Sequence, residues 1–161
     1  MTARVTVRPA VLDDSRAIAV GVRALLRELS GNSTREVERF EETYASLLAP
    51  ESAGGVLVAV GLAGVVGLLT YSVHVALRVG GDYALIEELW VEPAVRGRGV
   101  GLLLLDAVRA EGARLQCRRL EVGLPSSTFV GLADTRDFYL NAGFRALGER
   151  LVIDQLSRYE G

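Results

Sequence analysis

Hydrophobic positions along this chain form two kinds of pattern, a helical repeat and short continuous runs. After Asp13 and Asp14, either of which can cap a helix, apolar side chains recur at helical spacing as far as Leu29. The apolar face of this predicted helix carries Ile18, Val22, Leu25 and Leu29. The runs 56–60 and 65–71 are instead short and almost wholly apolar, and glycines lie between them. They therefore predict a buried β-hairpin with a glycine turn.

The remaining patterns continue to alternate between strands and helices. A strand is expected at 4–8 and a second helix from a Thr34 cap through Leu48, and the second hairpin strand can extend through His74 to Leu77. Further strands are expected at 83–91, 118–123, 144–147 and 150–156, and further helices at 100–115 and 134–142, the last capped by Asp134 and ended by Gly143.

This order predicts an α/β (α+β) fold with one mixed sheet and helices on its faces. The strands at 83–91 and 118–123 are joined by a helix, so they should run parallel. The chain has 161 residues, with no linker and no internal repeat, so a single domain over 1–161 is expected.

The segment 52–77 contains no charged residue and is long enough to span a bilayer. Its five glycines and clustered valines favour the hairpin over a membrane helix. The start of the chain has no apolar signal-peptide region. The net charge of −2 gives no electrostatic reason to bind nucleic acid or an anionic membrane. We therefore expect a cytoplasmic protein that binds neither nucleic acid nor a membrane.

The composition excludes several classes of enzyme. All 18 basic residues are arginine, and the absence of lysine excludes a P-loop NTPase, a pyridoxal phosphate enzyme and a protein kinase. With one histidine, His74, and one cysteine, Cys117, the chain cannot build a Cys/His zinc site or an internal disulfide. No metal is expected.

A glycine-rich loop follows the strand predicted at 83–91 and opens the next helix. Its residues are Arg96, Gly97, Arg98, Gly99, Val100 and Gly101. Glycines let the backbone approach a ligand, and the first N–H groups of a helix lack partners at the positive end of its dipole, so the loop can hold a pyrophosphate. The two arginines can add charge-assisted contacts. Leu102 excludes the Gly-x-Gly-x-x-Gly dinucleotide fingerprint, while a turn without a ligand stays open as an alternative.

Three segments, in this order and separation, resemble the GNAT acyltransferase superfamily. The loop at 96–101 resembles its Arg/Gln-x-x-Gly-x-Gly/Ala motif, and Leu-Trp-Val-Glu-Pro at 89–93 resembles the Leu-x-Val-x-Pro that precedes it. Phe-Tyr-Leu-Asn-Ala-Gly-Phe at 138–144 resembles Phe-Tyr-x-x-x-Gly-Phe. The resemblance covers nearly the whole chain. It implies a GNAT-like sheet in which two parallel strands splay apart to form a cleft for acetyl-CoA.

The resemblance also implies how acetyl-CoA would be held. Pantetheine would lie along the strand at Leu89, Trp90 and Val91 and pair with its backbone, while the pyrophosphate would rest on the loop at 96–101. The N–H of Val91 would stabilise the oxyanion of the tetrahedral intermediate. The partners expected are acetyl-CoA and an amine acceptor, and a homodimer is a habit of the family.

An amine that attacks a thioester must lose a proton, so a base is expected. The family often uses a strand carboxylate four residues before the valine, which here is Glu87. Strand alternation predicts that Glu87 lies on the same side as Leu89 and Val91, and Glu88 on the other, which favours Glu87. Glu88 and His74 remain alternative bases, and each of the three can equally be structural.

The leaving thiolate needs a proton donor, and Tyr139 matches the family's position for it. The sequence therefore predicts an N-acetyltransferase that works by direct attack in a ternary complex. The alternative is a non-catalytic acyl-CoA-binding module, which would keep the loop but would not need Glu87 or Tyr139. The identity of the amine and the role of the loop at 124–133 stay open.

Overall fold

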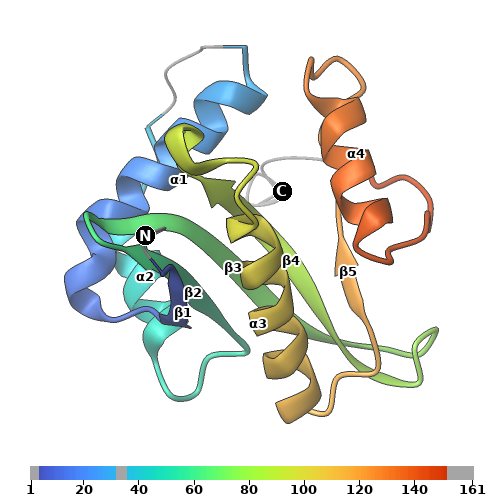
Figure 1. Cartoon of the computed structure of the whole chain (residues 1–161). Helices are drawn as coiled ribbons and strands as arrows, with labels where there is room; N and C mark the ends of the chain where they lie inside the picture. The colour runs from blue at the N-terminus through green and yellow to red at the C-terminus, as the bar shows by residue number, and fades with distance from the viewer. Residues whose placement is uncertain (1–3, 32–35, 152–161) are drawn as a thin grey trace, which may run out of the picture.

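The computed structural model describes residues 4–31 and 36–151. In them a mixed sheet of five strands, in the order β1-β2-β3-β4-β5, carries helices on both faces (Figure 1). The strands are β1 (Thr6–Pro9), β2 (Gly54–Gly61), β3 (Gly64–Ala76), β4 (Gly81–Val91) and β5 (Leu120–Val122). The α-helices are α1 (Ser15–Leu29), α2 (Phe40–Leu48), α3 (Val100–Arg114) and α4 (Leu132–Asn141), and short 3-10 helices span Leu12–Asp14 and Pro93–Val95. The predicted fold class is confirmed.

The last two strands of the sheet are the parallel pair. β1 to β4 are antiparallel neighbours, whereas β4 and β5 run parallel. They pair only over Ala84–Ile86 and Leu120–Val122, although β4 runs on to Val91. Figure 1 shows β5 and α4 standing apart from the upper end of β4. The predicted parallel pair is therefore confirmed, and the two strands separate after Ile86.

The uncharged segment 52–77 forms β2 and β3 and lies at the centre of the sheet. Its side chains alternate between two clusters: Leu57 and Leu69 pack under α3, while Val58 and Leu68 pack under α1 and α2. Both faces of these strands are buried, which explains why polar residues do not alternate along them. In the part of the chain that the structure describes, no helix is long and apolar enough to cross a membrane.

The starts of the first two long helices differ from the prediction. Asp14 precedes α1, but its carboxylate makes no cap; it accepts hydrogen bonds from Arg8 at 2.7 and 2.9 Å and from the N–H of Val11 at 2.9 Å. Both oxygens of this carboxylate are held by the Arg8 guanidinium in a bidentate ion pair, so neither is turned to the first N–H groups of α1. α2 begins at Phe40, not at residue 34, and the expected Thr34 cap lies outside the described residues.

The C-terminal prediction is partly wrong. α4 begins at Leu132, so Asp134 lies within its first turn and is not its cap, although Gly143 ends the helix with a φ of 94° as expected. The segment 144–147 forms no strand. Phe144 instead packs edge-on against Tyr139, with 5.3 Å between the ring centroids. The strand expected at 150–156 lies almost wholly outside the described residues.

Candidate functional site

A cavity of about 520 Å³ lies where β5 separates from β4. The end of β4, the last turns of α1, the loop before α3, the segment after β5 and helix α4 form its walls. Every predicted site residue except Arg98 lines it. The structure thus brings together residues that are up to 52 positions apart in the predicted set, from Glu87 to Tyr139.

β4 contains a bulge at Glu87. Thr70 of β3 lies opposite Glu88 and Tyr71 lies opposite Ile86, so Glu87 has no register partner on β3. An extra residue of this kind reverses the alternation of everything beyond it on the strand.

The backbone hydrogen bonds of β4 show this reversal. The N–H of Ala84 donates to the carbonyl of Arg119, the residue just before β5, at 3.0 Å, whereas the N–H of Glu88, four residues later, donates to the hydroxyl of Thr70 on β3 at 3.1 Å. In a regular strand, groups four residues apart point the same way. The N–H and C=O groups of Leu89 and Val91 therefore point toward the β5 side of the sheet, at a height where β5 no longer pairs with β4. That side is the cavity.

The bulge also corrects the predicted sides of the two glutamates. Glu88 accepts a hydrogen bond from Thr70, and Glu87 accepts one from Ser72. Thr70 and Ser72 are two residues apart on β3 and share a face, so both carboxylates lie on that face, away from the core that contains Leu89. The prediction that Glu87 shares a side with Leu89 and Val91 is wrong, because alternation does not hold through a bulge. Both glutamates line the cavity.

The two carboxylates differ in their surroundings. Burial raises the pKa of Glu88; the hydrogen bond from Thr70 partly opposes this rise, and the negative charge of Glu87 adds to it. Glu87 is about half exposed, at 45% of its side chain. His74, the other predicted alternative base, does not line the cavity; its Nε2 lies 3.9 Å from Oε1 of Glu87, on the side of Ser72.

The glycine loop presents an unusual run of free backbone donors. Gly97 and Gly99 have φ angles of 73° and 82°, a left-handed conformation that glycine adopts without strain. In the part of the chain that the structure describes, none of the N–H groups of 97–102 donates to a backbone carbonyl. These groups surround the N-terminus of α3, where the helix dipole favours an anion. The pyrophosphate cradle stays a prediction, and the positive φ angles and free N–H groups of this loop are features that such a cradle needs.

The two arginines of this loop are placed differently. Arg96 lines the cavity, but its guanidinium donates to the carbonyl of Val91 at 2.8 Å and pairs with Glu28 of α1 at 2.6 Å. This contact joins α1 to the end of β4. Arg98 is exposed and does not line the cavity. The predicted phosphate contacts from arginine therefore have weaker support from the geometry than the backbone cradle has.

Tyr139 lies on α4 with only 7% of its surface exposed, and it lines the cavity. Phe138 and Phe144 pack edge-on against its ring, at centroid distances of 5.1 and 5.3 Å. Among the described residues, no group forms a hydrogen bond with its hydroxyl. Burial raises the pKa of this phenol to about 12, so it stays protonated at neutral pH and can act as a donor.

Helix α1 forms part of the cavity wall, which its sequence pattern did not indicate. Leu25, Glu28 and Leu29 line it, although helical spacing had marked the two leucines only as a core face. The one usable signal is the opposite charge of Glu28 and Arg96, and their separation of 68 positions hides it in a single sequence. Pro125 and Phe129, from the loop whose role was open, line the opposite wall.

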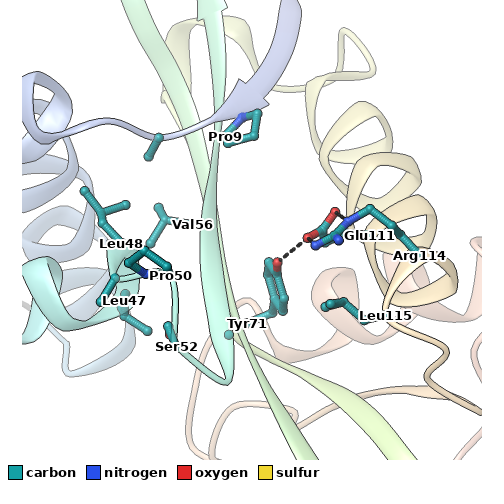
Figure 2. A pocket seen from close by; sticks show the side chains of 13 residues that line it. Pro9, Leu47, Leu48, Pro50, Ser52, Val56, Tyr71, Glu111, Arg114 and Leu115 are labelled. Carbon is teal, nitrogen blue, oxygen red and sulfur yellow. Dashed lines mark hydrogen bonds and ion pairs between the residues drawn. The ribbon is translucent and has the colours of Figure 1, made fainter.

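A second cavity, of about 380 Å³, lies at the edge of the sheet between α2 and α3 (Figure 2). Its polar groups satisfy one another: the hydroxyl of Tyr71 donates to Glu111 at 3.0 Å, and Glu111 pairs with Arg114 at 2.6 Å. None of the predicted site residues lines this cavity. The cavity between β4 and β5 is therefore the candidate functional site.

Solved structures share this fold. A possible acetyltransferase from Clostridium difficile 630 superimposes with a TM-score of 0.78 at 16% identity, covering 94% of this chain and 97% of that one. An aminoglycoside acetyltransferase from an uncultured soil metagenomic sample gives 0.72 at 17%, covering 94% and 99%. A ribosomal-protein-alanine N-acetyltransferase from Brucella melitensis biovar Abortus 2308 gives 0.71 at 19%, covering 94% and 99%. At such identities the likeness shows the fold alone.

A search of curated protein sequences found no match. A family model described as "Acetyltransferase (GNAT) family" matches residues 22–144, which is most of the chain. This range contains all the β4, loop and α4 residues that line the cavity. The chain belongs to the GNAT family of acetyltransferases.

Proposed function

We propose that this protein is an N-acetyltransferase that moves the acetyl group of acetyl-CoA onto a primary amine by direct attack in a ternary complex. The observation that carries the proposal is the arrangement of the cavity between β4 and β5. Its lining combines the free N–H groups of the glycine loop with the carboxylates of Glu87 and Glu88 and a buried, protonated tyrosine.

In this proposal acetyl-CoA replaces the missing part of β5. The pyrophosphate accepts hydrogen bonds from the N–H groups of 97–102. Pantetheine lies along β4 and pairs with the backbone N–H and C=O groups of Leu89, which face the cavity because of the bulge. The C=O of Val91 already accepts a hydrogen bond from Arg96, so Val91 offers only its N–H. This places the thioester near Val91, whose N–H can donate to the oxyanion of the tetrahedral intermediate.

The reaction needs one proton acceptor and one proton donor. Glu87 takes a proton from the amine, the amine nitrogen bonds to the thioester carbon, and the C–S bond then breaks. The hydroxyl of Tyr139 donates a hydrogen bond, and then a proton, to the departing sulfur. Glu88 is the rival base, because its raised pKa makes its carboxylate the better proton acceptor.

The test begins with binding and proceeds to turnover. Isothermal titration calorimetry with CoA and acetyl-CoA should show association; a folded protein that binds neither would sink the proposal. Release of free CoA is then measured with kanamycin, spermidine and a peptide that begins with alanine, of which the first and last follow the names of similar structures. Binding without transfer to any amine would instead support the non-catalytic acyl-CoA-binding module.

Two matched variants identify the base. Glu87→Gln and Glu88→Gln each remove one carboxylate and keep the shape of the side chain. We expect Glu87→Gln to lower kcat by about 100-fold with the KM for acetyl-CoA unchanged, and Glu88→Gln to have the smaller effect. The reverse order would move the base to Glu88.

A further inference from the structure

Two side chains of β3 contact Glu87 from outside the cavity. The hydroxyl of Ser72 donates to Oε1 of Glu87, and Nε2 of His74 lies 3.9 Å from the same oxygen. Within the described residues, no group is bonded to Oε2 of Glu87. One carboxylate oxygen of Glu87, a residue that lines the cavity, is thus anchored on β3, and the other has no protein partner among the described residues.

Counting protons gives the direction of these bonds. A serine hydroxyl has one proton, and Ser72 donates it to Glu87. In the contact of 2.8 Å between Ser72 and His74, Nε2–H of the imidazole must therefore be the donor and Oγ of Ser72 the acceptor. The resulting chain runs from His74 through Ser72 to Glu87, and each member donates to the next.

The imidazole of His74 is itself held in place. Its ring stacks on Tyr83 of β4, with centroids 5.4 Å apart and an angle of 29° between the planes. Arg78 lies 4.9 Å from the centre of the same tyrosine ring and pairs with Glu121 at 2.7 Å. His74, the first donor of this series of hydrogen bonds, is therefore supported by β4 and, through Arg78 and Glu121, by β5.

We propose that Ser72 and His74 are positioning residues that fix the Glu87 carboxylate for proton abstraction. The inference rests on the proposed function, in which Glu87 is the base. A half-exposed glutamate on a bulge would otherwise sample several rotamers, and a base acts only within hydrogen-bond reach of the proton it removes. Anchoring Oε1 from β3 leaves Oε2 directed at the acceptor amine.

Paired substitutions separate positioning from a merely structural role. His74→Phe keeps a ring to stack on Tyr83 but has no N–H donor, whereas His74→Gln keeps a donor and loses the ring. Likewise Ser72→Ala removes the hydroxyl and Ser72→Thr keeps it. We expect His74→Phe and Ser72→Ala to lower kcat about tenfold with the KM for acetyl-CoA unchanged, and the other two to stay within about threefold of the parent.

The kinetic outcomes distinguish this inference from the base assignment. The assay uses acetyl-CoA and the most reactive amine of the panel, and thermal melting confirms that each variant folds. If Glu87→Gln is impaired while His74→Phe and Ser72→Ala keep full kcat, the positioning role is refuted and the base stands. If His74→Gln loses activity and His74→Phe keeps it, ring stacking is what matters and the inference fails. If Glu87→Gln keeps full activity, the base assignment itself fails.

A spectroscopic test needs no turnover. His74 is the only histidine of the chain, so the imidazole region of a ¹⁵N spectrum reports on it alone. This series of hydrogen bonds requires the neutral ring to carry its proton on Nε2, and we expect the spectrum of the neutral ring to show that tautomer. A neutral ring protonated on Nδ1 could not donate to Ser72, and finding it would overturn the inference even if catalysis were as proposed.

Discussion

Tyr139 differs from phenylalanine by one hydroxyl group, and that group is the part of the side chain that the proposed mechanism uses. Tyr139→Phe should not destabilise the free protein. The ring is 7% exposed, and no described residue forms a hydrogen bond with the hydroxyl. The hydroxyl oxygen is not among the buried side-chain atoms that lack a hydrogen-bond partner in the described residues, so water in the cavity can reach it. Its removal should therefore change the free energy of unfolding by less than about 1 kcal/mol.

The effect on turnover should be large. The pKa of about 12 lies about 3.5 units above that of an ordinary thiol, so complete proton transfer to a thiolate would be uphill by about 5 kcal/mol if the thiol kept its solution value. The phenol therefore acts first as a hydrogen-bond donor to the developing thiolate, whose own pKa the same apolar cavity raises. Losing this donor should lower kcat by about 100-fold, or about 2.7 kcal/mol.

Tyr71→Phe is the matched control, because Tyr71 is also buried but its hydroxyl donates to Glu111 at 3.0 Å, outside the functional cavity. It should lose about 1–2 kcal/mol of unfolding free energy and keep its kcat. The assays are CoA release, calorimetry with acetyl-CoA and urea unfolding. We expect acetyl-CoA affinity to be nearly unchanged in both variants. If Tyr139→Phe turned over as fast as the parent, Tyr139 would have no part in the mechanism.

Three further predictions test the cradle, the packing and the ion pair. Gly99→Ala and Gly80→Ala each add a methyl group at a positive φ angle, 82° and 72°, where no atom lies within 4 Å, so each should lower the free energy of unfolding by about 1–2 kcal/mol. Only Gly99→Ala should also weaken acetyl-CoA binding in calorimetry, and equal affinities of the two variants would count against the cradle. Gly21→Ala puts a Cβ 2.6 Å from the side chain of Leu68, and overpacking of about 1–3 kcal/mol should exceed a helix gain of about 1 kcal/mol; higher stability in urea would contradict this. The hydrogen bonds from Arg8 lower the pKa of Asp14 in the folded protein below its unfolded value of about 4. The Arg8–Asp14 pair therefore stabilises the fold above about pH 4, and this stabilisation is lost as the pH falls through the pKa of Asp14 in the folded state. Asp14→Asn should therefore narrow the difference between unfolding free energies measured at about pH 6 and about pH 3, and an unchanged difference would show that other groups cause it.

The fold could be predicted because each long element repeats its hydrophobic pattern over many residues. The run 52–77 gave the hairpin, and the helical spacing after Asp14 gave α1, since both depend on burial of a whole face. The segment 144–147 misled the prediction, because a few apolar residues suit a strand but also suit packing against an aromatic ring. Phe144 does the latter, against Tyr139.

The candidate site was predictable only where a local motif defined it. The glycines at 97 and 99 require positive φ angles, which a sequence can indicate. Contacts between distant segments were not accessible in this way. Glu28 accepts a hydrogen bond from the guanidinium of Arg96, which lies 68 positions later in the sequence, and no periodicity in either segment indicates this contact.

The bulge at Glu87 could not be predicted from the sequence, and the proposed placement of both substrates depends on it. With regular alternation from Ala84 onward, the N–H groups of Glu88 and Trp90 would face the cavity, and Glu87 would point away from Glu88. One extra residue instead turns the edge of β4 at Leu89 and Val91 toward the proposed pantetheine and leaves both carboxylates on one face. The thioester would then lie in the plane of the sheet while the base stands on one face of it. An amine bound on that face would have its nitrogen beside the thioester carbon and its proton beside Glu87. Glu87, the bulge residue, lacks a register partner on β3, but Ser72 and His74 of that strand contact it. In our proposal these contacts fix its carboxylate, so we expect the two side chains to affect kcat and not the KM for acetyl-CoA.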